Sequence, residues 1–324
     1  MKKNIYASAC RLLFLAASSL LTTALVAQTP AYFPLQVGNS WLYRLKNSRA
    51  GEDRYRSISV EGRETIGGRE YFTVNYMGRT LALRSNSDGS IVVFDRASGT
   101  DQPFLLLVGL PEGASFPTVI DQCTRSGRVD SISAVVRTPA GEFSNVLLIS
   151  YQLECADAGI TQQYYAPGVG LVLHQETSFA GPREYELVYY RTETSSGAGQ
   201  EVSFSVGLDS SRYLPNSNLG VRLTLRSMGP DPLLLVFPSS QTYDLKVINE
   251  LGTAVYVWSA DKLFAAVYRE EKFGPGERTY GVTAPLGNLR PGKYKVQAYL
   301  TTNPLRFLGE VGFEVVLPSG VTAE

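Results

Sequence analysis

Histidine is nearly absent from this chain of 324 residues, in which only His174 occurs. A Ser-His-Asp triad would have to use that residue, and no Gly-x-Ser-x-Gly sequence accompanies it. We therefore interpret His174 as a surface or hydrogen-bonded strand residue rather than a catalytic base. No stretch has the residue spacing of a zinc site, a calcium loop or a phosphate-binding loop. We expect no metal and no cofactor, and we predict that the chain is not an enzyme.

An excess of charge is missing as well, because 30 Lys and Arg balance 30 Asp and Glu. Without residues 1–27, which contain three basic residues and no acidic ones, the net charge is −3. Such a balance gives no electrostatic attraction to nucleic acid or to an anionic membrane, so neither is expected as a partner.

Long hydrophobic runs are limited to the first 27 residues. Lys2, Lys3 and Arg11 provide positive charge, and the run LLFLAASSLLTTALVA is too short for a stable membrane span. These features predict a signal peptide over residues 1–27, cleaved after Ala27, with an uncleaved anchor as the alternative. We expect a secreted or periplasmic protein that has no membrane attachment after cleavage.

Cysteine is scarce, with three residues in all. Cys10 lies inside the predicted signal peptide, which leaves Cys123 and Cys155 in the exported chain. An even pair in an oxidising compartment favours a disulfide between them, although two buried free thiols are the alternative.

A helical repeat of apolar residues is not present in any window of a dozen residues, whereas alternation typical of strands is frequent. Trp41, Tyr43 and Leu45 alternate in this way, and the Gly67-Gly68 and Asp88-Gly89 pairs suit hairpin turns. The sequence predicts an antiparallel β domain over residues 28–192.

This N-terminal part resembles a domain of undefined function in secreted bacterial proteins. The resemblance rests on the segments PLQVGNSWLYR, AGEFSNVLLISYQLEC and YYAPGVGLV. In the last of these, Pro167 fixes the backbone while Gly168 and Gly170 permit a tight turn into a strand. The resemblance implies no activity.

Small and polar residues at 193–200 predict a linker. Short alternating strands recur after it, such as VRLTLRS and KYKVQAYL, at the spacing of a β-sandwich. We predict an immunoglobulin-like β-sandwich at residues 201–318, followed by a tail at 319–324. The fold class is therefore all-β.

The sandwich region resembles the intracellular proteinase inhibitor (BsuPI) family. The motifs that carry this resemblance are Phe237 followed by SSQTYDL, Gly252, VWS at Val257–Ser259, Phe264, Pro275-Gly276-Glu277, Leu289, Pro291-Gly292 and Tyr294-Lys295-Val296. The resemblance implies an immunoglobulin-like fold and, from the founding member, inhibition of a subtilisin-type serine protease. This chain departs from that founding member in having an export signal and an additional N-terminal domain.

Four aromatic residues of these motifs, Phe237, Trp258, Phe264 and Tyr294, are expected in the sandwich core, Trp258 from a strand. Contact with a protein partner would then fall to loops, for which Leu214–Leu219, Ser227–Pro232 and Ala260–Leu263 are candidates. Within the second loop, Pro230, Asp231 and Pro232 are the favoured contact residues, because two prolines lower the cost of ordering the loop. The function expected is non-catalytic binding of a protein, with a serine protease as the favoured partner. The alternative is a structural or adhesive module of the cell envelope.

Overall fold

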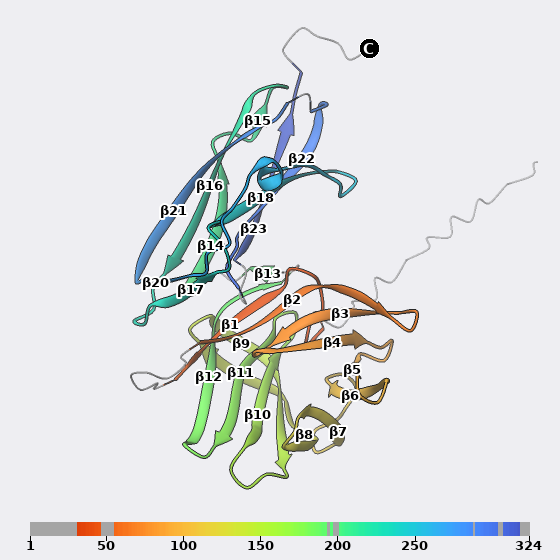
Figure 1. Cartoon of the computed structure of the whole chain (residues 1–324). Helices are drawn as coiled ribbons and strands as arrows, with labels where there is room; N and C mark the ends of the chain where they lie inside the picture. The colour runs from red at the N-terminus through yellow and green to blue at the C-terminus, as the bar shows by residue number, and fades with distance from the viewer. Residues whose placement is uncertain are drawn as a thin grey trace, which may run out of the picture. The chain divides into compact units, whose positions relative to one another are not determined.

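The computed structural model describes residues 31–46, 55–192, 195–196, 201–287, 289–303 and 307–317, and these fold almost entirely into strands (Figure 1). The first group of strands comprises β1 (Ser40–Leu45), β2 (Tyr55–Ile66), β3 (Arg69–Tyr76), β4 (Arg79–Ser85), β5 (Ser90–Asp95), β6 (Thr100–Leu106), β7 (Ser115–Asp121), β8 (Thr124–Thr138), β9 (Gly141–Leu153), β10 (Gly159–Ala166), β11 (Gly170–Ser178), β12 (Gly181–Thr192) and β13 (Ser195–Ser196). The second comprises β14 (Val202–Leu208), β15 (Arg212–Tyr213), β16 (Asn218–Ser227), β17 (Leu233–Phe237), β18 (Tyr243–Asn249), β19 (Ala254–Val257), β20 (Arg269–Phe273), β21 (Gly276–Pro285), β22 (Gly292–Leu300) and β23 (Leu308–Val315). Within the described ranges, the one helical element is the single 3-10 turn η1 (Trp258–Asp261). The all-β fold class is confirmed.

The strands β1 to β13 form one antiparallel sheet of 13 strands. Twelve of them follow the order β6-β5-β4-β3-β2-β1-β12-β11-β10-β9-β8-β7, and β13 pairs with β12 beside this path, so that nearly every strand pairs with its neighbours in sequence. The two outer strands, β6 and β7, also approach each other, because the Thr118 hydroxyl donates a hydrogen bond of 2.6 Å to the Phe104 carbonyl. Both glycine turns predicted for this region lie where expected, between β2 and β3 and between β4 and β5.

Two large side chains of β1 anchor the core of this sheet. Trp41 and Tyr43 are fully buried, and they donate hydrogen bonds of 2.6 and 2.9 Å to the carbonyls of Val169 and Leu171. A Cβ atom at Gly170 would lie 3.0 Å from Trp41 Nε1, and the φ angle of Gly170 is +112°. The glycine predicted to allow a turn therefore also lets the indole ring approach the backbone closely.

A charged cluster around Asp101 ties β6 to the neighbouring strands. Its carboxylate accepts hydrogen bonds from the Tyr71 hydroxyl at 2.7 Å and from Arg84 at 2.6 Å, and Arg69 lies 3.3 Å away. Burial alone would raise the pKa of Asp101. The hydrogen bonds from Tyr71 and Arg84 and the nearby positive charge outweigh burial, and they hold this pKa below its ordinary value of 3.8.

Because the folded state lowers the pKa of Asp101, the ionised carboxylate stabilises the fold above pH 3.8, and this contribution disappears as the pH falls through the folded-state pKa. We expect Asp101→Asn to lower the free energy of unfolding at pH 7 by about 1 kcal/mol. The difference between variant and wild type should shrink below pH 3.8 in urea unfolding curves. Asp157→Asn, at an exposed bend, is the control and should leave the curves unchanged. A difference that persists undiminished at pH 2 would contradict this role of the charge.

The strands β14 to β23 form two main sheets, with orders β14-β16-β21 and β15-β23-β22-β18-β19, and a small pair β17-β20. Apolar side chains of both main sheets share one buried cluster, which includes Leu223 of β16, Val247 of β18 and Val296 of β22. The alternation predicted for residues 221–226 is confirmed, since the apolar residues point inward and the arginines outward. Two sheets packed on a common core form a sandwich.

A further apolar cluster joins side chains from the two groups of strands. It contains Leu42 and Tyr189 of the large sheet together with Phe237 and Phe307. The described residues from Ala31 onward belong to one compact unit. The division into domains at 193–200 stays a prediction; of that linker, Ser195–Ser196 form β13, which pairs with β12, and the remaining residues lie outside the described ranges. The predicted signal peptide and the tail at 319–324 lie outside them as well.

Candidate functional site

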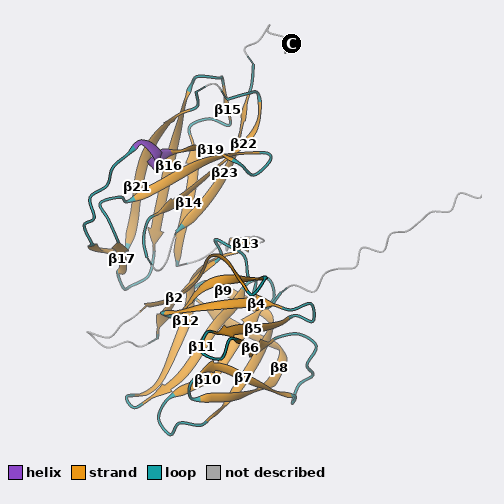
Figure 2. Cartoon of the chain, turned by 45° about the vertical axis from the view of Figure 1, so that its right-hand side comes forward, coloured by secondary structure: helices purple, strands orange, loops and turns teal. Residues whose placement is uncertain are grey.

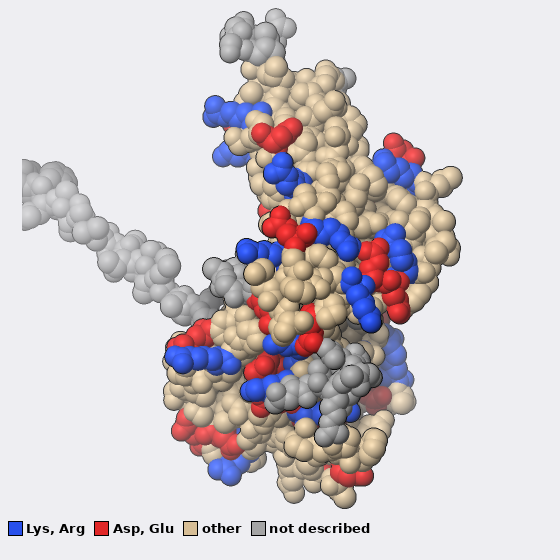
Figure 3. Space-filling view, turned by 90° about the vertical axis from the view of Figure 1, so that its left-hand side faces the viewer, with Lys and Arg blue, Asp and Glu red and all other residues tan. Residues whose placement is uncertain are grey.

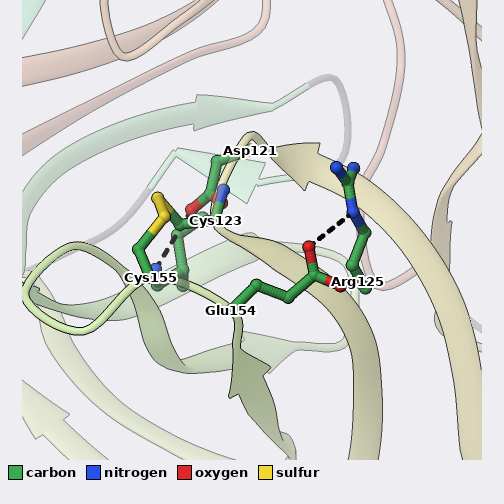
Figure 4. Close-up of a disulfide and its surroundings, with 6 residues drawn as sticks. Asp121, Cys123, Arg125, Glu154 and Cys155 are labelled. Atoms are coloured by element: carbon green, nitrogen blue, oxygen red, sulfur yellow. Dashed lines mark hydrogen bonds and ion pairs between the residues drawn. A yellow bond between two sulfur atoms is a disulfide. The ribbon is translucent and has the colours of Figure 1, made fainter.

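The predicted disulfide between Cys123 and Cys155 is present and links the β7–β8 turn to the end of β9 (Figure 4). Asp121 supports the turn, because its carboxylate accepts a hydrogen bond of 2.7 Å from the Cys123 amide. Next to the disulfide, Arg125 and Glu154 form an ion pair at 2.9 Å. The disulfide therefore fastens an edge of the large sheet.

His174 is buried in a polar cluster, as expected of a hydrogen-bonded strand residue. Its Nδ1 lies 3.0 Å from Gln163 Nε2, and its Nε2 lies 3.3 Å from a Glu176 oxygen. The Gln163 amide also accepts hydrogen bonds from Tyr151 and Tyr165, at 2.8 and 2.7 Å. Among the residues that the structure describes, no group of three or more His, Cys, Asp or Glu residues is suited to hold a metal ion.

The four aromatic residues singled out in the sequence do not form one cluster. Phe237 is fully buried, and the guanidinium of Arg269 lies 4.5 Å from the centre of its ring. Tyr294 is half-buried and stacks on Phe313 at the margin of the sandwich core. Trp258 and Phe264 lie together, with ring centres 6.0 Å apart.

The expected strand position of Trp258 is wrong, because the residue begins η1 just after β19 ends. The side chain is half-buried and packs against Tyr243, with a separation of 4.8 Å between ring centres. The aromatic composition that favours strands does not distinguish a strand from a turn packed on the edge of a sheet. Trp258 thus covers the edge of the core instead of filling its centre.

The loop with Pro230, Asp231 and Pro232 contacts another part of the chain. The Asp231 carbonyl accepts a hydrogen bond of 3.2 Å from the Tyr55 hydroxyl, and the side chain is half-buried. Both prolines are exposed. Part of this loop is therefore already used within the molecule, which lowers its suitability for a partner.

The structure draws attention instead to the segment Asp261–Tyr268, which includes the end of the candidate loop Ala260–Leu263. We call it the Leu263 segment. It begins at the last residue of η1, continues without forming a strand and leads to β20, and it appears as a long loop beyond the turn in Figure 2. Leu263 is completely exposed, with a relative accessibility of 102%, and Val267 and Tyr268 are more than half exposed. An apolar segment in this position is unusual for a surface loop.

A buried carboxylate fixes the start of this segment. Asp244 of β18 is 5% exposed and accepts hydrogen bonds from the Ser259 amide at 3.2 Å and from the Ser259 hydroxyl at 2.6 Å. The Tyr299 hydroxyl donates a further bond of 3.2 Å to the same carboxylate. Charge-assisted bonds of this kind are the stronger ones in proteins, so the turn η1 is held firmly on the sheet.

A serine fixes the segment on its other side. The Ser240 hydroxyl accepts a hydrogen bond of 2.9 Å from the Ala265 amide, and the Ser240 amide donates one of 2.9 Å to the Ala265 carbonyl. Residues on both sides of Leu263 are therefore bound to the body of the sandwich.

Between these two attachments, the side chains of Lys262 and Phe264 both pack on Trp258. The Lys262 ammonium lies 4.6 Å from the centre of the indole ring and donates a hydrogen bond of 2.7 Å to the Trp258 carbonyl. A hydrogen bond to Asp261 raises the pKa of Lys262 above its ordinary value. Because side chains alternate in an extended chain, Leu263 points away from the surface that holds its two neighbours.

Comparison with protein-family models gives one match in this region. Residues 206–305 match the BsuPI family, described as intracellular proteinase inhibitor. The C-terminal part of the chain therefore carries a BsuPI domain, and this domain includes the Leu263 segment, Asp244 and Ser240. The resemblance noted in the sequence is confirmed for these residues. A domain that matches a proteinase inhibitor family suggests a non-catalytic, inhibitor-like role.

The curated proteins contain no match to the chain. Among solved structures, the sporulation control protein Spo0M from Bacillus subtilis has 10% identity and a TM-score of 0.24; the match covers 37% of this chain and 50% of that one. A putative lipoprotein from Parabacteroides distasonis has 13% identity and a TM-score of 0.29; the match covers 50% of this chain and 99% of that one. The chain thus spans about half the length of the first of these structures. At TM-scores this low, neither likeness supports a conclusion about fold or function.

Proposed function

We propose that this chain is a secreted or periplasmic, non-catalytic protein whose BsuPI domain inhibits a subtilisin-type serine protease by direct contact. The observation that carries the proposal is the match of residues 206–305 to a family of proteinase inhibitors. In this proposal residues 28–192 and 201–318 form separate domains, and the first serves as an accessory to the inhibitory one.

The proposed location is supported by two independent features of the chain. Residues 1–27 combine an apolar run with positive charge before it, as in signal peptides. The disulfide between Cys123 and Cys155 suits an oxidising compartment outside the cytoplasm. No helix in the described part of the chain is long and apolar enough to cross a membrane.

The distribution of charge suits contact through shape and apolar area. On the face drawn in Figure 3, Lys and Arg side chains lie among Asp and Glu side chains, without a large region of one sign. Ion pairs such as Arg278 with Glu271 and Lys295 with Glu310 neutralise charges in the part of the chain formed by β14 to β23. Binding should therefore depend on a few apolar anchors and only weakly on salt.

Titration of subtilisin-type proteases with the purified chain tests this function. We expect peptide hydrolysis to fall linearly with added chain and to stop near one equivalent, while a metalloprotease measured in parallel stays active. A lack of inhibition of several such serine proteases at micromolar concentration would reject the proposal. The structural or adhesive alternative would then gain support if the chain binds to cell envelopes of its source organism.

A further inference from the structure

We propose that Leu263 is the primary contact residue of the inhibitor and enters the specificity pocket of a serine protease that accepts large aliphatic side chains. This inference rests on the proposed function and assigns it to one segment of the chain. The partner surface is the substrate cleft of the protease, and the residue that fills its pocket is fully exposed in this structure.

The backbone just before Leu263 is extended. Residue Lys262, just before Leu263, has φ −118° and ψ 146°, which is the conformation of a β-strand. Peptides that bind by strand addition use such an extended backbone, with alternate side chains entering pockets. Serine proteases select substrates mainly by the side chain that enters one pocket, and in several of them this pocket is an apolar slot. A fully exposed leucine directly after this extended residue matches that requirement.

The Leu263 segment is held in place before any partner binds. Ser259 is bound to the buried Asp244, and Ala265 is bound to Ser240, so that both flanks of Leu263 are fixed. Trp258 supports the side chains of the two adjacent residues. A segment that is already ordered loses little conformational entropy on binding, and this is a general property of tight inhibitors.

Two other apolar side chains are almost as fully exposed as Leu263, but they lack this geometry. Phe179 and Leu251 are 90% and 89% exposed, but each lies in a tight turn that connects two strands. A turned backbone does not extend along a substrate cleft. These two residues therefore serve as matched controls for exposure and apolar character.

The test compares Leu263→Asp with Phe179→Asp and Leu251→Asp in the full chain, titrated against the same subtilisin-type protease. We expect Leu263→Asp to raise the inhibition constant at least 100-fold, because a carboxylate would have to enter an apolar pocket without a partner. The two controls should inhibit as the wild type does. Circular dichroism should show the same strand content in all four proteins, since each substitution is at an exposed position.

A change of specificity provides an independent measurement. Trypsin has an Asp at the base of its pocket and prefers a basic side chain. Leu263→Arg should therefore gain inhibition of trypsin while losing at least 100-fold against the subtilisin-type protease. If the wild type inhibits and Leu263→Asp inhibits equally well, the inference is overturned while the proposed function stands. If the wild type inhibits no serine protease, both are rejected.

Discussion

Replacing Trp258 with alanine should weaken inhibition of the protease about 100-fold while the sandwich still folds. The indole ring supports Lys262 and Phe264 on either side of Leu263, and alanine would remove both contacts. The Leu263 segment would then have to be ordered during binding. The measurement is the inhibition constant of the variant, together with its melting curve.

The size of this effect follows from the entropy of ordering. Fixing the backbone of one residue costs about 1–2 kcal/mol, and three residues lose their support. The hydrogen bonds at Ser259 and Ala265 remain, so only part of this cost reappears on binding. A loss of about 3 kcal/mol corresponds to roughly 100-fold in the inhibition constant.

Two variants control for other effects of this substitution. Trp258→Phe retains a ring and should lose less than about tenfold, since an aromatic face still supports Lys262. Tyr294→Ala removes another half-buried aromatic side chain, far from Trp258. Tyr294 lies near one end of β22, whereas Leu300 at the other end pairs with Tyr243, the residue on which Trp258 packs. This variant should destabilise the fold and leave the inhibition constant unchanged. Equal inhibition by Trp258→Ala and the wild type would show that the segment needs no such support.

Removal of the disulfide should lower the free energy of unfolding by about 3–4 kcal/mol. Cys123 and Cys155 are 32 residues apart, and closing a loop of this length restricts the unfolded chain by that amount in the chain-entropy model. The test is urea unfolding of the Cys123→Ser, Cys155→Ser double variant and of the wild type, with and without a reductant.

The reductant should bring the wild type to the stability of the double variant, and it should leave the variant itself unchanged. Because the disulfide lies in the large sheet, we expect no change of the inhibition constant where the protein remains folded. A loss of stability below about 1 kcal/mol would contradict the account of the disulfide. A parallel loss of inhibition would indicate that the large sheet takes part in binding.

Much of the fold could be predicted from local patterns. Alternating apolar residues identified β16 and β22, and the pairs Gly67-Gly68 and Asp88-Gly89 identified the hairpins that follow β2 and β4. These signals depend on a few neighbouring residues, and the structure retains them because each sheet has one buried face. The strands β6, β7 and β10 gave no such signal. Pro103 and Pro117 interrupt the first two, and buried Gln163 interrupts the third, where hydrogen bonds from tyrosines compensate for its polarity.

The candidate site was only partly predictable for a related reason. The loop Ala260–Leu263 is among the candidates, but the two prolines favour the loop Ser227–Pro232. The hydrogen bond from Tyr55 to Asp231, which already engages that second loop, joins residues 176 positions apart and leaves no local pattern in the sequence. The attachments at Asp244 and Ser240 depend likewise on contacts across the sandwich. Sequence patterns describe the preferences of each stretch and contain little about such distant pairs.

The proposed inhibitor has to occupy the substrate cleft of a serine protease, and competition for that cleft tests this most directly. A subtilisin-type protease with its catalytic serine replaced by alanine should bind the chain without cleaving it. A peptide inhibitor that occupies the cleft should then displace the chain competitively, with the apparent Kd rising in proportion to peptide concentration. An apparent Kd that stays constant at saturating peptide would place the contact elsewhere and contradict the account.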